Sequence, residues 1–224
     1  MFQISESENL NFEKNYENEI YHNMIGIFEQ LKKKKIKLKI FEDNRAELED
    51  TRSEFEISLG IAKEAVSPKT KLEIVLSKII FNSPDKEFEK HIKSMSPKTD
   101  PFQHKLLLKN LTTIYNILES RRLESCYGDI YKGAKDRFED ARHYYFSNQF
   151  QKNAIPNDPI EALRFARYDQ TDLVLNSEFK VAIDYINGVE LTGRKGAYDL
   201  ALMYWEKVVQ KFLFEEREKI EESN

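Results

Sequence analysis

The chain has 224 residues, of which 40% are hydrophobic and 33% are charged, with a net charge of -4 at pH 7. This balance is typical of a folded globular protein with one or two domains and excludes wholesale disorder. The 7 glycines and 6 prolines supply too few turns for a β-sandwich or β-barrel, and the acidic balance argues against a dedicated nucleic-acid-binding protein.

A seven-residue repeat of apolar side chains runs through residues 20–66, which contain no proline. One series of positions is Met24, Leu31, Leu38, Arg45, Arg52, Leu59 and Val66, and the other is Ile20, Ile27, Lys34, Phe41, Leu48, Phe55 and Ala62. Eleven of these fourteen positions are apolar, and spacings of three and four residues place them on one stripe of a helix. The repeat therefore predicts one long coiled-coil-like helix, about 70 Å in length.

The predicted partner face of this helix consists of Leu31, Leu38, Arg45, Leu48, Arg52 and Phe55. Ile36, Ile40, Ile57 and Ile61 form pairs away from this stripe, which indicates a helix that contacts partners on two sides. A second interpretation stays open for residues 35–40, whose lysines alternate strictly with apolar residues as in a β-strand.

Four later helices are predicted from a capping residue followed by proline, because proline fits the first helical position. These pairs are Ser67-Pro68, Ser83-Pro84, Asp100-Pro101 and Asp158-Pro159, and they predict helices over residues 68–82, 84–95, 101–122 and 159–168. Gln103 and Glu161 stand three residues after two of the caps, as in a capping box. The polar segment between Lys93 and Pro101 predicts a linker, with a helical arm over residues 1–95 and a compact α-helical bundle over residues 100–224.

Three further helices are predicted over residues 129–150, 171–187 and 195–220. Gly188 is expected to end the second of them, because glycine adopts the left-handed conformation that follows a helix. The fold class predicted from the whole chain is all-α.

Two groups of basic residues are candidates for binding. Lys32–Lys35, Lys37 and Lys39 form a basic run, which is flanked by acidic segments that weaken its field. Six arginines lie between Arg121 and Arg167, and eight of the eleven tyrosines lie beyond Cys126. They predict a protein-interaction surface, because Arg and Tyr are enriched at interfaces. The alternative is a set of arginines paired with Asp136, Glu139, Asp140 and Asp169.

The segment Arg137-Phe-Glu-Asp-Ala-Arg-His143 resembles the catalytic motif of HEPN ribonucleases, which are small all-helical proteins that act as dimers. The resemblance covers seven residues. It implies that His143 takes part in acid–base chemistry and that Arg137 holds the phosphate. The alternative is that His143 pairs with Glu139 or Asp140 on the same helix.

Metal and cofactor sites are not predicted. Glu19 and His22, and Asp140 and His143, have the spacing of di-iron helix pairs, but carboxylates are common in this chain. Cys126 has no histidine near it in the sequence and is interpreted as a small packed residue.

The sequence as a whole favours a non-enzymatic protein–protein interaction or assembly subunit, with a protein partner or a second copy of the chain. The alternative is a HEPN-like ribonuclease that uses Arg137 and His143. A single cysteine, the absence of a signal-like segment in residues 1–8 and the absence of a long apolar run predict a cytoplasmic protein without a membrane span.

Overall fold

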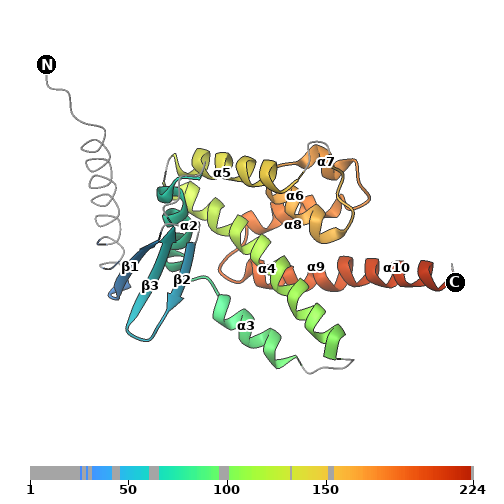
Figure 1. Cartoon of the computed structure of the whole chain (residues 1–224), viewed down its shortest axis with the longest axis horizontal. Helices are drawn as coiled ribbons and strands as arrows, with labels where there is room; N and C mark the ends of the chain where they lie inside the picture. The colour runs from blue at the N-terminus through green and yellow to red at the C-terminus, as the bar shows by residue number, and fades with distance from the viewer. Residues whose placement is uncertain are drawn as a thin grey trace, which may run out of the picture. The chain divides into compact units, whose positions relative to one another are not determined.

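The computed structural model describes residues 26, 29, 32–41, 46–60, 66–95, 101–131, 133–150 and 154–222. The described residues are mostly helical, with one three-stranded sheet (Figure 1). Contacts divide the chain into an N-terminal unit, residues 1–76, and a C-terminal unit, residues 77–224. The predicted helical character is confirmed, and the sheet is the exception to it. The predicted domain boundary at residues 95–100 stays a prediction.

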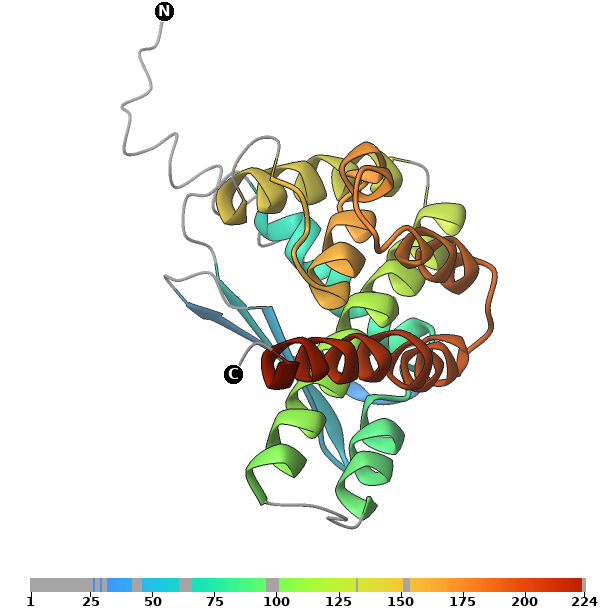
Figure 2. The same cartoon turned by 90° about the vertical axis from the view of Figure 1, so that its right-hand side faces the viewer.

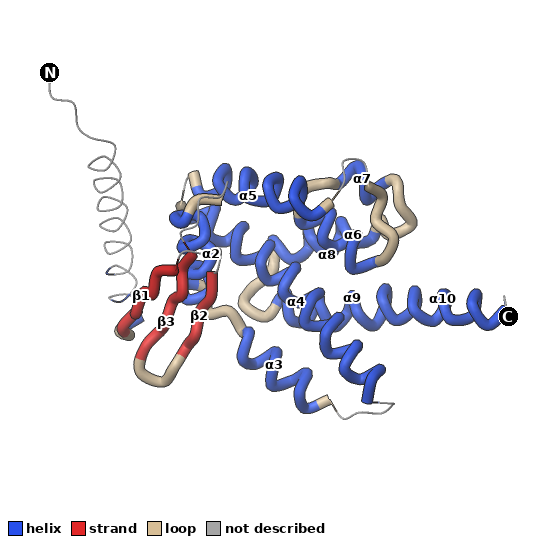
Figure 3. The backbone as a smooth tube through the Cα atoms, in the orientation of Figure 1, coloured by secondary structure: helices blue, strands red, loops and turns tan. Residues whose placement is uncertain are grey.

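The sheet contains β1 (Lys35–Phe41), β2 (Ala46–Asp50) and β3 (Glu54–Gly60). The strand order is β1-β3-β2, with β1 parallel and β2 antiparallel to the central strand β3 (Figure 3). Cross-strand pairing aligns Leu38, Ile57 and Leu48 in one row. Because side chains alternate along each strand, one face of the sheet is apolar and the other carries lysines and glutamates. Ile36, Ile57 and Leu59 are buried on the apolar face.

The predicted long helix over residues 20–66 is wrong between Lys35 and Gly60, where the three strands lie. The strand interpretation of residues 35–40 is confirmed by β1. Two of the polar positions in the seven-residue repeat mark the ends of strands, since Lys34 precedes β1 and Arg52 lies in the turn between β2 and β3. The Thr51 side chain closes that turn by donating to the Glu54 carbonyl oxygen at 2.7 Å. Most of residues 20–34 lie outside the described ranges.

Two short helices follow the sheet, α2 (Pro68–Ile80) and α3 (Asp85–Ser94). The cap of α2 is confirmed, because the Thr70 backbone N–H donates to Ser67 Oγ at 3.1 Å. Ser83 does not cap α3 with its side chain, although the helix begins within one residue of the predicted position. Both helices match their predicted ranges closely.

The C-terminal unit is organised around α4 (Pro101–Ile130), a helix of 30 residues. The helices α5 (Ala134–Gln149), α6 (Pro159–Arg167) and α8 (Val181–Glu190) pack against it. The short helix α7 (Thr171–Leu175) joins α6 to α8. The helix α3 and the first turns of α4 lie together at one end of this unit, away from α5 and α6 (Figure 1, Figure 2).

A continuous helical segment ends the described chain. It consists of α9 (Gly196–Tyr204), the π-helix η1 (Trp205–Val209) and α10 (Gln210–Glu222). We call this segment the C-terminal rod. Its α9 part packs against α4, whereas α10 extends beyond the ends of the other helices of the unit (Figure 1).

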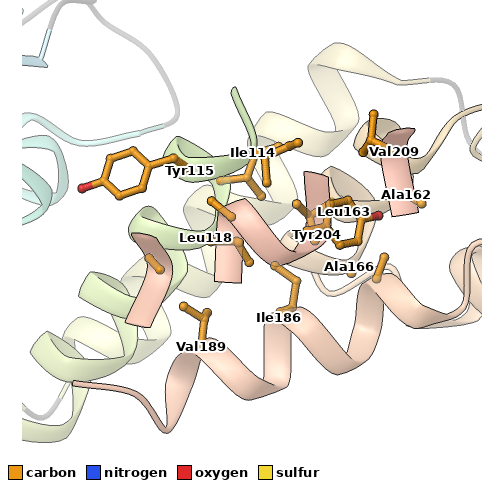
Figure 4. Close-up of a cluster of buried hydrophobic side chains, with 14 of the residues drawn as sticks. Ile114, Tyr115, Leu118, Ala162, Leu163, Ala166, Ile186, Val189, Tyr204 and Val209 are labelled. Carbon is orange, nitrogen blue, oxygen red and sulfur yellow. The ribbon is translucent and has the colours of Figure 1, made fainter. Parts of the chain in front are cut away.

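The core of the C-terminal unit lies where α4, α6, α8 and the rod meet (Figure 4). Its fully covered side chains include Ile114 and Leu118 from α4, Leu163 from α6 and Val189 from α8. The Tyr204 hydroxyl is buried and donates to the Pro159 carbonyl oxygen at 2.6 Å, so this polar group has a partner.

Four predicted boundaries in this unit are wrong, and one of them is the start of the helix predicted from residue 129, because α5 begins at Ala134. The helix predicted over residues 101–122 continues to Ile130, and the one predicted over residues 171–187 is interrupted between α7 and α8. Gly188 lies inside α8 and does not end it. The left-handed glycine is instead Gly133, with φ of 85°, immediately before α5.

Candidate functional site

The described residues that were predicted to form the partner face of a long helix do not lie on a helix. Leu38, Leu48 and Phe55 lie half-buried on β1, β2 and β3, on the same side of the sheet. Arg52 is exposed in the turn between β2 and β3. Leu31 and Arg45 lie outside the described residues. The structure thus brings three of the six residues together, but on a sheet.

The lysine run has acidic neighbours in the sheet. Lys39 and Lys37 on β1 both contact Glu56 on β3, Lys37 at 3.7 Å. The hydrogen bond from Lys39, followed by the charges of both lysines, lowers the pKa of Glu56 below its ordinary value, against the effect of desolvation. Lys34 pairs with Asp50 and lies 4.1 Å from the ring centre of Phe55. These contacts neutralise a large part of the predicted basic patch.

Arg137 and His143 both lie on α5. His143 is exposed and its Nε2 atom lies 3.9 Å from Glu139, the partner expected in the alternative interpretation. Arg137 is half-buried near Gly133. Six positions along an α-helix separate two side chains by about 120° around its axis. The ribonuclease hypothesis stays a prediction, and it would need a second chain to enclose these two residues.

Most of the predicted arginine surface is used inside the C-terminal unit. Glu124 on α4 accepts from Arg142 on α5 at 3.0 Å and from Arg167 at the end of α6 at 2.8 Å. Asp169 accepts from Arg142 at 2.7 Å and contacts Arg121 at 3.0 Å. Arg121 also donates to Glu190 on α8. We call this cluster the Glu124 network. It joins four helices, and Asp169 is the one predicted acidic partner that belongs to it.

A second polar cluster joins α3 to α4. Ser83 Oγ lies 2.7 Å from an oxygen of Asp85 and 2.6 Å from an oxygen of Glu119, and Tyr115 donates to Asp85 at 2.7 Å. Arg122 makes two hydrogen bonds of 2.7 Å to the buried carboxylate of Glu119. Both clusters combine buried acids with bases, which is the arrangement that a stable interior charge requires.

Burial and charge shift the pKa values of this second cluster. Burial alone would raise the pKa of Asp85, but the Lys78 ammonium at 2.9 Å and the hydrogen bonds from Ser83 and Tyr115 together hold it below its usual value. Burial, and then the charges of Glu119 and Asp85, hold the pKa of Tyr115 far above its ordinary value. Tyr115 is therefore a neutral donor at physiological pH.

An open groove in the C-terminal unit has a volume of about 440 Å³. One wall is formed by a face of α4, a second by the first turns of α6 and a third by the rod. The lining residues are Leu106, Lys109, Asn110, Thr113, Asp158, Pro159, Ile160, Glu161, Arg164, Val209, Phe212 and Leu213. Leu106 and Leu213 are each 42% exposed at its edges, so the groove presents apolar surface to solvent. We call it the α4–α6–α10 groove.

The charged residues of this groove differ in how they are used. Asp158 caps α6 by accepting from the backbone N–H groups of Ile160 and Glu161 at 2.8 and 2.9 Å. Glu161 in turn accepts from the Asn157 backbone N–H at 2.7 Å. Lys109 and Arg164 are exposed, and neither has a carboxylate within 4.0 Å among the described residues. The groove therefore offers apolar surface beside two cations without a carboxylate partner and two carboxylates that accept backbone hydrogen bonds at the start of α6.

The remaining candidates lie elsewhere. Cys126 on α4 is half-buried, and burial raises the pKa of its thiol. In the described ranges, no group of three or more His, Cys, Asp or Glu side chains has an arrangement that could hold a metal ion. Glu19 and His22 lie outside those ranges. No described helix is both long enough and apolar enough to cross a membrane.

Sequence reasoning missed the groove because its walls come from three distant segments. The one local signal is the spacing of Leu106, Lys109, Asn110 and Thr113, which places them on one face of a helix.

No protein-family model matches the chain, and no curated protein and no solved structure matches it.

Proposed function

We propose that this chain is a non-enzymatic protein–protein interaction or assembly subunit that contacts its partner through the α4–α6–α10 groove. The observation that carries this proposal is an apolar groove whose edge residues, Leu106 and Leu213, are exposed beside Lys109 and Arg164. Helical proteins commonly bind an amphipathic helix in such a groove, with apolar anchors inside and charges at the rim. We therefore assign the proposed interaction surface to the C-terminal unit and not to a long N-terminal helix.

The exposed apolar edges of the groove favour a macromolecular partner. The groove is open to solvent, and its apolar side chains come from three helical segments that pack on one core. Exposed apolar residues gathered at one site are typical of interaction surfaces. The Glu124 network supports this role by holding α4, α5, α6 and α8 in fixed positions.

The test compares two variants in the cells that express the protein. Chemical crosslinking followed by affinity capture is applied to the wild type, to Leu106→Ser in the groove and to Ile130→Ser at the far end of α4. We expect specific crosslinked proteins that are lost with Leu106→Ser and kept with Ile130→Ser. Recovery of the same proteins with both variants would show that the partner does not use the groove.

A further inference from the structure

The two outer strands of the sheet each have one edge without a neighbouring strand. Both β1 and β2 pair with the central strand β3 alone (Figure 3). The turn between β2 and β3 determines which backbone groups of β2 face its free edge, because the Thr51 N–H donates to the Glu54 carbonyl oxygen at 3.0 Å. Along an antiparallel pair, residues alternately direct their N–H and C=O groups at the partner strand and away from it.

This alternation assigns the outward groups of β2. In the register of the two strands, Glu47 and Glu49 fall at the positions that face β3, as Thr51 does. Ala46 and Leu48 fall at the positions that turn away from it. The N–H and C=O groups of Ala46 and Leu48 therefore point to the free edge of the sheet.

The two free edges of the sheet differ in how their backbone groups are used. At the edge of β1, the Ile36 N–H donates to a carboxylate oxygen of Glu29 at 2.6 Å. Among the described residues, no hydrogen bond reaches the outward groups of Ala46 or Leu48 at the edge of β2. Ala46 and its neighbour Glu47 are exposed, so another chain can reach this edge.

The side chains of β2 define the chemistry that this edge can recognise. Glu47 and Glu49 are exposed on the polar face, and neither has a basic partner in the part of the chain that the structure describes. Leu48 lies half-buried on the apolar face. A complementary strand therefore carries cations opposite the two glutamates and an apolar residue opposite Leu48. The strand β1 has this pattern within the same sheet, where its lysines contact Glu56 of β3.

We propose that the free edge of β2 binds an extended segment of a partner protein in which Lys or Arg alternates with apolar residues. The segment adds to the sheet as a fourth strand, antiparallel to β2, which is a common mode of peptide recognition. Its apolar residue opposite Leu48 exchanges two backbone hydrogen bonds with Leu48. The residues on either side place their cations opposite Glu47 and Glu49, where opposite charges stabilise a strand pair. This surface lies in the N-terminal unit and is additional to the α4–α6–α10 groove.

The first measurement uses a dye-labelled peptide, Thr-Lys-Val-Lys-Val-Lys-Thr, and fluorescence anisotropy with the full chain at low salt. We expect saturable binding at least about tenfold tighter than that of a peptide of the same composition whose three lysines are adjacent. The matched composition separates strand pairing from attraction by net charge. Equal affinities of the two peptides, or no binding of either, would overturn the inference.

The second measurement tests the backbone hydrogen bonds. In an antiparallel strand with valine opposite Leu48, the valine N–H groups face β2 and the lysine N–H groups face solvent. Methyl groups on both valine nitrogens are expected to weaken binding about tenfold, and methyl groups on two lysine nitrogens less than about threefold. Equal effects of the two modifications, or a larger effect of the lysine methyl groups, would overturn antiparallel strand addition.

The third measurement reverses the charge of the edge. Glu47→Lys with Glu49→Lys is expected to bind the alternating lysine peptide at least about tenfold more weakly, because like charges then face each other. The same variant is expected to bind Thr-Glu-Val-Glu-Val-Glu-Thr, which the wild type does not bind, and this gain shows that the variant is folded. Loss of the lysine peptide without that gain would overturn the inference.

Glu139→Lys with Asp140→Lys is the matched control, because both residues are exposed on α5 and the net charge changes equally. This control is expected to bind the lysine peptide as the wild type does, and equal losses in the two double variants would overturn the inference. Sedimentation equilibrium of the full chain tests the other occupant. Dimers that disappear with Glu47→Lys and Glu49→Lys would identify a second copy of this chain at the edge and overturn the partner segment.

Discussion

The sheet and the C-terminal unit both contain many lysines, arginines and carboxylates, but they place them differently. In the sheet, Lys37, Lys39 and Glu56 lie exposed or half-exposed on one face and pair across the strands. In the C-terminal unit, Glu124 and Arg142 lie between helices, with side chains 6% and 9% exposed. Water solvates the first group in the folded protein and is excluded from the second.

This difference in exposure determines how much each group of charges affects the stability of the fold. Exposed pairs are screened by water and salt, so they affect the charge of a surface more than the stability of a fold. A buried pair contributes little more than apolar packing would, but removing one partner leaves an uncompensated charge in the interior. The sheet charges are therefore expected to tolerate substitution, whereas the Glu124 network is expected to hold α4, α5, α6 and α8 in register.

The largest expected effect is that of Glu124→Ala. The substitution leaves Arg142 and Arg167 without the carboxylate that lies 3.0 and 2.8 Å from them. We expect the free energy of unfolding to fall by about 3–5 kcal/mol, measured by urea denaturation followed by circular dichroism. Glu139→Ala on the exposed side of α5 is the control and is expected to change stability by less than about 0.5 kcal/mol. A loss below about 1 kcal/mol for Glu124→Ala would contradict a structural role of the network.

A smaller effect is expected at the start of α6. Asp158 accepts from two backbone N–H groups that have no other partner in the helix. Asp158→Ala is expected to reduce the free energy of unfolding by about 1 kcal/mol. Asp158→Asn should recover most of the loss in the same urea experiment, because an amide oxygen can also accept these bonds. Equal losses for the two substitutions would show that charge, and not capping, is what Asp158 supplies.

Asp85 makes the stability that the polar cluster between α3 and α4 contributes depend on pH. The pKa of Asp85 is lower in the folded protein than in the unfolded chain. Its contribution to the free energy of unfolding is therefore complete above the unfolded pKa and is lost as pH falls through the folded pKa. Asp85→Asn is expected to be less stable than the wild type at neutral pH and to lose less stability on acidification. The difference is on the order of 0.5 kcal/mol, because the side chain is 35% exposed and solvent screens it. Urea denaturation curves from neutral to acidic pH measure this difference in the free energy of unfolding. Equal losses of stability on acidification in the wild type and in Asp85→Asn would contradict the prediction.

Helix starts could be predicted from sequence where the cause is local. Ser67 and Asp158 are followed by proline, and each accepts the backbone hydrogen bonds that the capping pattern requires. The sheet could not be predicted with the same certainty, because the pairing of β1 with β3 joins residues far apart in the sequence. The alternation in residues 35–40 was the correct local signal, and the seven-residue repeat across residues 20–66 competed with it.

The groove and the Glu124 network were beyond sequence reasoning for a related reason. The acids predicted to pair with the arginines include Asp169 but not Glu124, and both of these partners of Arg142 come from segments other than its own helix. Helical periodicity shows which residues share a face and does not show which faces meet. Leu213 and Phe214 have the same apolar character as core residues, so their exposure becomes visible only when the packing of the rod is known.

The smallest effect is expected in the sheet, at Glu56. Lys39 and Lys37 lower the pKa of this carboxyl, so the pairs persist at neutral pH and are lost as pH falls through that lowered value. Glu56→Gln is expected to leave the urea midpoint at neutral pH close to that of the wild type. Added salt should reduce the remaining difference, because it screens exposed charges. A loss that matches Glu124→Ala and persists in high salt would mean that the sheet charges act like the buried ones, and the contrast between the two regions would then be wrong.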